Sequence, residues 1–152
     1  MNKLIEFESD LEQLNNFSKK FANKTKIGDL FFLSGDLGVG KTTFARALIN
    51  SLFDINNMTK PERIKSPSFP IMISYPLRDC EICHYDFYRV TDKIELSEIG
   101  IFEELEKNIS IIEWPDIILN NFRLGNYYLL EFQIIDLNNR LIKIFHTQKK
   151  RL

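Results

Sequence analysis

The residues most suited to chemistry stand together at positions 35–42, Gly-Asp-Leu-Gly-Val-Gly-Lys-Thr, which satisfy the pattern G-x-x-x-x-G-K-[ST] in full. Glycines in such a loop let the backbone approach a phosphate group closely and turn its N–H groups inward. Lys41 supplies a point charge for the β- and γ-phosphates, and the Thr42 hydroxyl is an oxygen ligand of the kind that Mg²⁺ prefers. The motif therefore predicts a P-loop that binds a nucleotide together with Mg²⁺.

A P-loop also needs a carboxylate at the end of a neighbouring buried strand, where it holds Mg²⁺ through water. Residues 109–113, Ile-Ser-Ile-Ile-Glu, have this form and make Glu113 the candidate. A strand-terminal glutamate that faces solvent is the alternative interpretation. Trp114, which follows directly, is either a packing residue or a stacking residue.

Polar residues also alternate along positions 83–89, Cys-His-Tyr-Asp-Phe-Tyr-Arg. Because successive side chains of a strand point to opposite faces, His84, Asp86 and Tyr88 would share one face. Asp86 is a candidate for orienting the attacking water or for contacting Mg²⁺ indirectly. An exposed edge strand with mixed residues would give the same pattern.

A Ser-Pro-Ser-Phe segment at residues 66–69 lies between the P-loop and that strand. In P-loop enzymes this position often holds a mobile segment whose hydroxyl group senses the γ-phosphate and Mg²⁺. Ser66 or Ser68 could serve in this way. Turn chemistry alone accounts for Ser-Pro-Ser equally well.

The elements that must position these residues follow from periodicity and from breaker residues. A capping box with Ser9 as N-cap and Glu12 as its partner predicts a helix to about residue 23. Strands alternate with helices in the first two-thirds of the chain, and strands end it. This order predicts an α/β protein with the P-loop NTPase fold, in which helices flank a mostly parallel central sheet and antiparallel strands lie toward the C-terminus. The predicted strands are 3–8, 30–33, 71–75, 81–88, 109–113, 127–135 and 140–147, and the predicted helices are 9–23, 41–52 and 91–107, the last interrupted at Gly100.

Composition limits the class of protein further. The 152 residues are 44% hydrophobic and 27% charged, with 20 Lys and Arg against 21 Asp and Glu and a net charge of −1. These values exclude a disordered or fibrous protein and argue against binding to DNA, RNA or anionic lipid by charge alone. We expect one domain over residues 1–152. The basic stretch 149–151 is interpreted as a solvated tail, with contact to RNA as the alternative.

The cellular location is predicted from absent signals. No apolar run approaches the 18 or so residues of a membrane helix, and the N-terminal residues turn acidic without an apolar signal region. Cys80 and Cys83 form a single CxxC, which we interpret as two reduced cysteines, with a redox pair or half a metal site as alternatives. We therefore expect a cytoplasmic protein without membrane contact.

Four segments, in this order, resemble the TsaE family, also called YjeE, whose members are small bacterial ATPases needed for the threonylcarbamoyl modification of adenosine in tRNA (t6A). The similarity runs from about Ser9 to Arg140, and the combination of H-x-D-x-Y-R with E-W-P is more specific than the P-loop alone. The segments are Gly-Asp-Leu-Gly-Val-Gly-Lys-Thr-Thr at 35–43, Ser-Pro-Ser-Phe at 66–69, His-Tyr-Asp-Phe-Tyr-Arg at 84–89 and Ile-Glu-Trp-Pro at 112–115.

The resemblance implies a protein that binds ATP and Mg²⁺, hydrolyses ATP slowly and acts with the TsaB–TsaD pair, the enzyme that transfers the threonylcarbamoyl group to tRNA. The chain would meet tRNA only through that complex, and it would bind no DNA. The resemblance also implies roles for individual residues. These are Gly38, Val39, Gly40, Lys41, Thr42 and Thr43 around the phosphates, Thr42 and Glu113 on Mg²⁺, Asp86 with Lys41 and Glu113 in hydrolysis, Ser68 as the sensing hydroxyl, Arg140 near the base and the main chain of Leu11 at the adenine.

Two positions depart from the family pattern. Ser68 stands where the family usually has Thr, which keeps the hydroxyl group. The late turn reads Asn138-Asn139-Arg140 without the usual Gly before the Arg, and Asn tolerates the positive φ that such a turn can require.

Three other functions compete with an ATPase partner in tRNA modification. A small-molecule P-loop kinase would need an acceptor pocket and a lid with clustered arginines, but the seven arginines of this chain are scattered and no lid insertion is evident. A GTPase is disfavoured because the guanine-reading N-K-x-D sequence is absent. A nucleotide-dependent scaffold without turnover is disfavoured by the presence of both Asp86 and Glu113.

Overall fold

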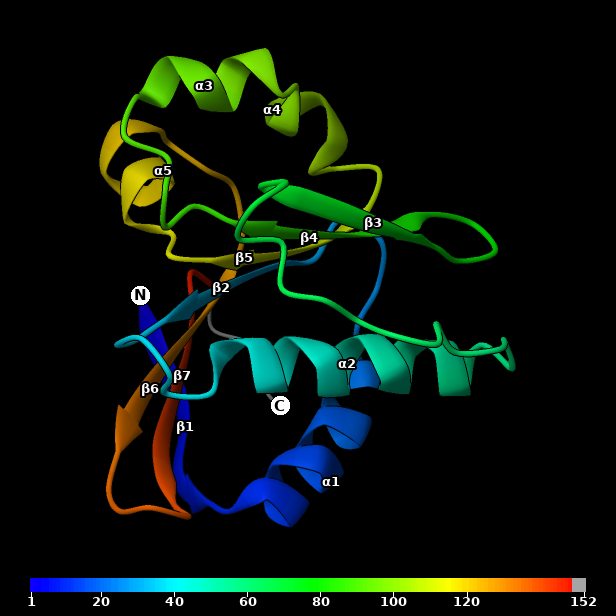
Figure 1. Ribbon diagram of the computed structural model, residues 1–152, viewed down its shortest axis with the longest axis vertical. Helices are drawn as coiled ribbons and strands as arrows, with labels where there is room; N and C mark the ends of the chain where they lie inside the picture. Colours follow the sequence, from blue (N-terminus) through cyan, green and yellow to red (C-terminus); the bar gives the residue numbers. More distant parts are fainter. Residues whose placement is uncertain (149–152) are drawn as a thin grey trace.

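The computed structural model describes residues 1–148, so the basic stretch 149–151 lies outside the described residues. A single seven-stranded sheet runs through the protein in the order β1-β7-β6-β2-β5-β4-β3 (Figure 1). The elements are β1 (Asn2–Ser9), α1 (Leu11–Ala22), β2 (Leu30–Ser34), α2 (Lys41–Ile55), β3 (Met72–Pro76), β4 (Glu81–Asp86), α3 (Lys93–Glu98), α4 (Ile101–Glu104), β5 (Ile109–Glu113), α5 (Asp116–Asn121), β6 (Tyr128–Ile134) and β7 (Arg140–His146).

The four central strands, β4, β5, β2 and β6, are parallel, which confirms the predicted α/β fold with a P-loop between the central strand β2 and helix α2. Antiparallel strands lie at both edges of the sheet: β7 and β1 continue it beyond β6, and β3 pairs with β4. The antiparallel part is thus not confined to the C-terminal end of the sequence. In a parallel sheet, the loops that follow the strands all lie at the edge formed by the C-terminal ends of the strands. The C-terminal ends of β2, β4 and β5 therefore meet at one edge of this sheet.

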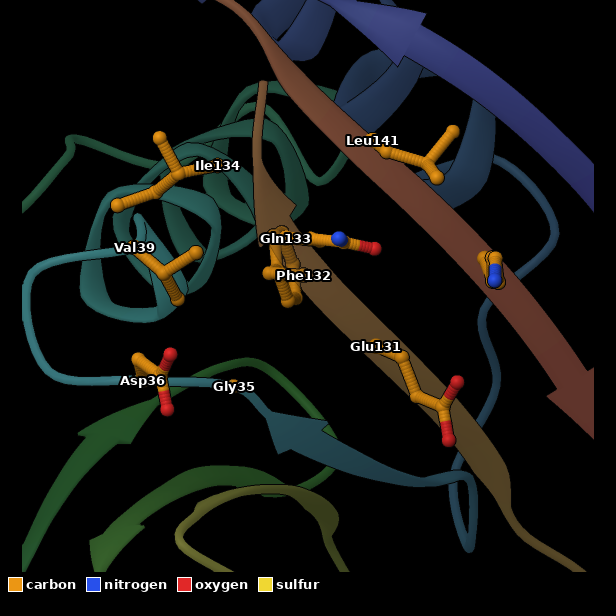
Figure 2. A pocket seen from close by; sticks show the side chains of 9 residues that line it. Gly35, Asp36, Val39, Glu131, Phe132, Gln133, Ile134 and Leu141 are labelled. Carbon is orange, nitrogen blue, oxygen red and sulfur yellow. The ribbon is translucent and has the colours of Figure 1, made fainter. Parts of the chain in front are cut away.

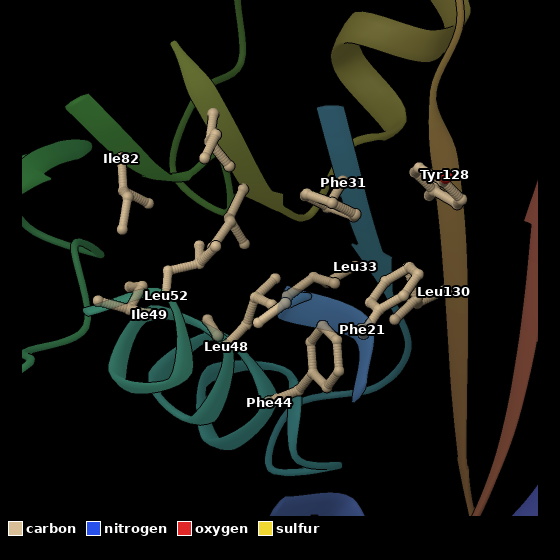
Figure 3. Packing of buried hydrophobic residues seen from close by; sticks show 14 of the residues in the cluster. Phe21, Phe31, Leu33, Phe44, Leu48, Ile49, Leu52, Ile82, Tyr128 and Leu130 are labelled. Carbon is tan, nitrogen blue, oxygen red and sulfur yellow. The ribbon is translucent and has the colours of Figure 1, made fainter. Parts of the chain in front are cut away.

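Helices cover both faces of the central strands (Figure 1). Helices α1 and α2 lie on one face, where Phe31 and Leu33 of β2 pack with Phe21 and Phe44 (Figure 3). Helices α3, α4 and α5 lie on the other face, over Phe32 and its neighbours. Burial on both faces explains why β2 reads as a continuous apolar run and not as an alternating one.

The start of α1 differs from the sequence prediction. Ser9 is the last residue of β1, where it pairs with Arg140, and it does not cap the helix. Asp10 is the N-cap instead, because its extended backbone lets the carboxylate accept the N–H of Gln13 at 2.8 Å. The Gln13 side chain accepts the Asp10 N–H at 3.0 Å, so the capping box is displaced by one residue from the predicted one.

The structure also differs from the sequence prediction at the end of β4 and at helix α5. Strand β4 ends at Asp86 and not at Tyr88, because the chain turns there: the Tyr88 N–H donates to the Asp86 carboxylate at 2.9 Å, and the Val90 N–H donates to the Phe87 carbonyl at 3.0 Å. Helix α5 had not been predicted, since six residues are too short for an apolar period to be recognised. Gly100, with φ of 69°, separates α3 from α4 as expected.

The two cysteines lie on opposite faces of the sheet. Cys80 packs against the core under α1 and α2, whereas Cys83 is buried in the core under α3 to α5. Both are free thiols, and the described residues contain no cluster of three or more His, Cys, Asp or Glu side chains suited to a metal. The redox and half-metal-site alternatives therefore receive no support. No helix within residues 1–148 is both long enough and apolar enough to cross a membrane.

Candidate nucleotide-binding site

The P-loop connects the end of β2 to the start of α2, and its first glycine is required by a close approach of two backbones. Gly35 has φ of 144°, and a Cβ placed on it would lie 2.6 Å from the carbonyl oxygen of Phe132. Strand β6 comes so near because Ser34 pairs directly with Glu131 in the parallel ladder. Any side chain at position 35 would displace the loop from the sheet.

The N-terminus of α2 is open toward the loop. Gly40 occupies the N-cap position with φ of 117°, no side chain caps the helix, and its first turn holds no acidic residue. The first N–H groups of an α-helix have no partner within the helix, and the helix dipole adds partial positive charge at that end. The start of α2 is therefore suited to an anion such as a phosphate group.

Lys41, the first residue of α2, directs its ammonium group back over the loop. Its side chain is 4% exposed, and Nζ donates hydrogen bonds to the carbonyl oxygens of Gly35 and Asp36, the latter at 2.9 Å. Nζ also lies 4.0 Å from the ring centroid of Trp114. Burial lowers the pKa of Lys41, and the negative charges of Glu113 and Asp86 partly offset that effect.

The Glu113 carboxylate faces the start of α2, as the sequence predicts for a strand-terminal acid. Its Oε2 accepts the Thr42 hydroxyl at 2.9 Å, and its Oε1 lies 2.8 Å from Nε2 of His84. Glu113 is buried, so the solvent-facing alternative is wrong. A hydroxyl and a carboxylate oxygen form a donor set that fits Mg²⁺, which needs only one or two protein ligands when phosphates and water complete its shell.

Asp86 reaches the same place from the neighbouring strand, because it pairs with Glu113 in the ladder between β4 and β5. The side chain is 5% exposed, and Oδ1 accepts the Tyr88 N–H at 2.9 Å. Burial raises the pKa of Asp86, and the charge of Glu113 adds to that rise, while the Tyr88 hydrogen bond opposes it. Asp86 is held by one oxygen, which leaves the other for water or a metal-bound water.

One cavity of about 260 Å³ is lined by Lys41, Thr42, Asp86 and Glu113. The loop and the Ser-Pro-Ser segment add Gly38, Gly40, Thr43, Ser66 and Ser68 to its lining. The sequence had placed Tyr88 on one strand face with Asp86 and had left Trp114 open between packing and stacking. Both residues line this cavity. Their ring centroids lie 4.8 Å apart, so Trp114 packs against a neighbour and lines the cavity at once. Trp114 has φ of 55°, a strained conformation for a residue other than glycine, and such strain gathers near functional sites.

A second cavity of about 300 Å³ adjoins the first and shares Gly38, Gly40 and Thr43 with it. Leu11 and Arg140 line it from opposite ends of the sequence. Arg140 Nε donates to the Val39 carbonyl at 2.8 Å, and a guanidinium NH donates to the carbonyl of Asp136 at 2.8 Å, which fixes the arginine against the loop. All the site residues predicted from the sequence thus lie around two adjoining cavities. Val39 is among them, although its side chain is buried in the core.

A third hollow, of about 430 Å³, lies beside the first residues of the loop and is bordered by β6 and β7 (Figure 2). Figure 2 shows Asp36 and Val39 on one side of it and the strand bearing Glu131 and Gln133 on the other. It is lined by Gly35, Asp36 and Val39 of the P-loop, but by none of Lys41, Thr42, Asp86 and Glu113. The two adjoining cavities are therefore the candidate site.

The fold and the loop sequence make this chain a P-loop protein of the α/β type, with its P-loop between a central parallel strand and an uncapped helix. The family model of the threonylcarbamoyl adenosine biosynthesis protein TsaE matches residues 8–142. The chain belongs to the TsaE family.

Relatives and a solved structure agree with this assignment. The tRNA threonylcarbamoyladenosine biosynthesis protein TsaE of Rickettsia typhi is 35% identical over 133 residues, which cover 88% of each chain. The protein of the same name from Borreliella burgdorferi is 36% identical over 134 residues, which cover 87% of this chain and 92% of the relative. The crystal structure of YdiB from Bacillus subtilis superimposes with a TM-score of 0.72 at 25% identity, covering 95% of this chain and 86% of the other.

Proposed function

We propose that this chain is a Mg²⁺-dependent ATPase that serves the biosynthesis of threonylcarbamoyladenosine in tRNA, together with a TsaB–TsaD transferase. Family membership supports the role in tRNA modification. The observation that carries the ATPase proposal is the convergence of Lys41, Thr42, Asp86 and Glu113 on one cavity beside an uncapped helix N-terminus.

Nucleotide binding would begin with the phosphates. The backbone N–H groups of the loop and of the first turn of α2 would donate to phosphate oxygens, and Lys41 would exchange its bonds to loop carbonyls for bonds to the β- and γ-phosphates. Thr42 and Glu113 would hold Mg²⁺, which neutralises charge on the β- and γ-phosphate oxygens. The base would enter the second cavity, between the main chain of Leu11 and the Arg140 guanidinium.

Hydrolysis requires a water molecule placed in line with the γ-phosphate. Asp86 is suited to this task, because one carboxylate oxygen is held by the Tyr88 N–H and the other is left to orient the water. Ser68 lines the same cavity and would sense the γ-phosphate through its hydroxyl group. Lys41 would stabilise the charge that develops in the transition state.

The properties of the whole chain support a role that depends on partner proteins. A net charge of −1 gives little attraction for tRNA, so contact with tRNA through a TsaB–TsaD complex fits better than direct binding. One sheet spans the described residues, which supports a single domain over residues 1–152. A cytoplasmic location remains part of this proposal.

A small-molecule kinase is not favoured as the alternative. Kinases usually gather several arginines around the transferred phosphate, whereas among the arginines of residues 1–148 only Arg140 lines either of the two cavities. Family membership points in the same direction.

The two functions can be separated with γ-labelled ATP, Mg²⁺ and purified TsaB–TsaD. We expect slow release of inorganic phosphate that rises when TsaB–TsaD is added, with no labelled acceptor. If the label appeared instead on a metabolite from a small-molecule extract, the kinase would be the correct function. The variant Lys41→Ala serves as the control for contaminating ATPases, because it removes the cation that the phosphates need.

A further inference from the structure

His84 is a buried polar residue that the proposed function leaves without a role. It lies on β4, its side chain has 0% exposure, and the alternation of the strand turns it toward the α2 face together with Ile82 and Asp86. Burial of an imidazole ring costs free energy unless its polar atoms are hydrogen-bonded. An apolar residue would be the simpler occupant of this position, so the contacts of His84 indicate what it does.

The His84 side chain forms a hydrogen bond with the carboxylate of Glu113. Nε2 lies 2.8 Å from Oε1, while Oε2 accepts the Thr42 hydroxyl at 2.9 Å. An ionised carboxylate only accepts hydrogen bonds, so Nε2 is the donor. Within residues 1–148, Nδ1 of His84 has no hydrogen-bond partner, so the bond to Glu113 is the one hydrogen bond that holds the ring.

We infer that His84 is a positioning residue that fixes the Glu113 carboxylate so that Oε2 stays directed toward Thr42, where the Mg²⁺ of a bound nucleotide would be held. Without this donor, Oε1 would be buried and unpaired, and the carboxylate could rotate away from Thr42. Hydrogen-bond partners of metal ligands typically change metal affinity by about 10–100-fold when they are removed. The inference rests on the proposed function, since it concerns the same metal site.

Two variants of similar size separate the hydrogen bond from the volume of the side chain. His84→Gln keeps an N–H donor at the end of a side chain that can reach Glu113, and His84→Met has similar length without a donor. The measurement is the affinity of the full chain for a fluorescent methylanthraniloyl-ADP, first in EDTA and then over a Mg²⁺ series. In EDTA, we expect the wild type and both variants to bind equally.

The Mg²⁺ series should divide the variants. His84→Met should need about 10–100-fold more Mg²⁺ than the wild type for the half-maximal gain in affinity. His84→Gln should stay close to the wild type, because its amide replaces the lost donor. In a Glu113→Gln background, His84→Met should change the Mg²⁺ requirement no further, since the oxygen that His84 fixes is then already altered.

Several results would overturn the inference: wild-type Mg²⁺ dependence in His84→Met, an equal loss in His84→Gln, or a loss of affinity that is the same in EDTA, as a merely structural role would give. If His84→Met does not fold, His84→Asn, whose amide is too short to reach Glu113, provides the same comparison. A raised Mg²⁺ requirement in that variant supports the inference, and an unchanged one overturns it. Failure of the proposed function is distinguishable, because the wild type itself would then bind no nucleotide or show no response to Mg²⁺.

Discussion

At the scale of single residues, the site depends on polar groups that the fold has removed from water. Lys41, Asp86 and Glu113 are all buried, at 4%, 5% and 2% exposure, although charged residues are almost never buried without partners. Each has a partner: loop carbonyls for Lys41, the Tyr88 N–H for Asp86, and Thr42 for Glu113. Charges held in this way act strongly on a bound phosphate, because little water screens them.

Replacing Lys41 by Ala should reduce ATP affinity by about 100-fold or more. Hydrogen bonds to a charged group are each worth about 1.5–3 kcal/mol, and every 1.4 kcal/mol is a tenfold change in the binding constant. Isothermal titration with MgATP measures this directly. The control is Lys60→Ala, since Lys60 pairs with Asp54 on the surface, at 3.0 Å and about half exposed. Wild-type affinity in Lys41→Ala would contradict the assignment of the loop as the phosphate site.

Asp86→Asn should separate ATP turnover from nucleotide affinity. The amide keeps an acceptor for the Tyr88 N–H but loses the charge, so ATP turnover should fall by about 10²–10⁴-fold while nucleotide affinity is retained. Phosphate release and titration with MgATP report the two quantities. Turnover at the wild-type rate would reduce Asp86 to a structural residue.

The same variant should be more stable than the wild type at neutral pH. Since burial raises the pKa of Asp86 above 3.8, the folded state binds the proton more tightly than the unfolded state does. The ionised carboxylate therefore lowers the free energy of unfolding above the folded-state pKa, and this penalty disappears as pH falls below 3.8. Thermal melts of the nucleotide-free proteins should show a higher melting temperature for Asp86→Asn at pH 7, with a difference that narrows in acid. A difference in melting temperature that widens in acid would show that folding does not raise the pKa of Asp86.

At the scale of elements, the strands and helices around the P-loop could be predicted from the sequence because strong periodicity and breaker residues mark them. β5 was predicted with its exact bounds, Ile109–Glu113, since it is a short apolar run between polar residues. The N-cap was misplaced by one residue because β1 pairs with β7 up to Ser9, and that pairing depends on a strand near the other end of the sequence. No local pattern contains such information.

The role of Asp10 as the N-cap of α1 can be tested by substitution. Asp10→Ala removes the acceptor of the Gln13 N–H and should lower the free energy of unfolding by about 1 kcal/mol. Asp10→Asn is the matched control, because its amide oxygen can accept the same N–H, and it should change stability by only a few tenths of that amount. Denaturant unfolding of the nucleotide-free chain measures both. Equal stability of Asp10→Ala and the wild type would show that Asp10 does not cap α1.

The placement of the cysteines on opposite sheet faces makes a second prediction at this scale. Burial raises the pKa of Cys83 to about 11, and burial also raises the pKa of the half-buried Cys80. Because the thiolate is the reactive form, an aromatic disulfide reagent at pH 8 should modify at most one thiol in the folded protein and both after denaturation. Cys80→Ser should remove the reactive thiol. A Cys80–Cys83 disulfide after mild oxidation, detected as a loss of two hydrogens by mass spectrometry, would contradict the structure.

At the scale of the whole molecule, segments from both ends of the chain meet at the P-loop. Leu11 and Arg140 line one cavity, and residues from β4 and β5 line the other. The residue types that carry chemistry could be recognised in the sequence because the P-loop, the strand-terminal glutamate and the aspartate strand have local signatures. The walls formed by Tyr88 and Trp114, and the contact between His84 and Glu113, depend on how strands pair and could not be predicted from local patterns.

The low net charge of the chain supports the proposal that its effect on tRNA passes through partner proteins. Its own binding would then be confined to one nucleotide and one metal ion. The surface that meets the partners would have to respond to that nucleotide, since a ligand shifts an equilibrium only by its differential affinity for the two states.

The central claim, an ATPase that serves tRNA modification, is tested most directly by reconstitution. Purified TsaB–TsaD, tRNA, the threonylcarbamoyl donor and ATP are combined with the wild-type chain, with Asp86→Asn or with no addition, and threonylcarbamoyladenosine is quantified by mass spectrometry of nucleosides. The wild-type chain should raise the yield, whereas Asp86→Asn, which should bind ATP without hydrolysing it, should not. Equal yields in all three reactions would contradict the claim.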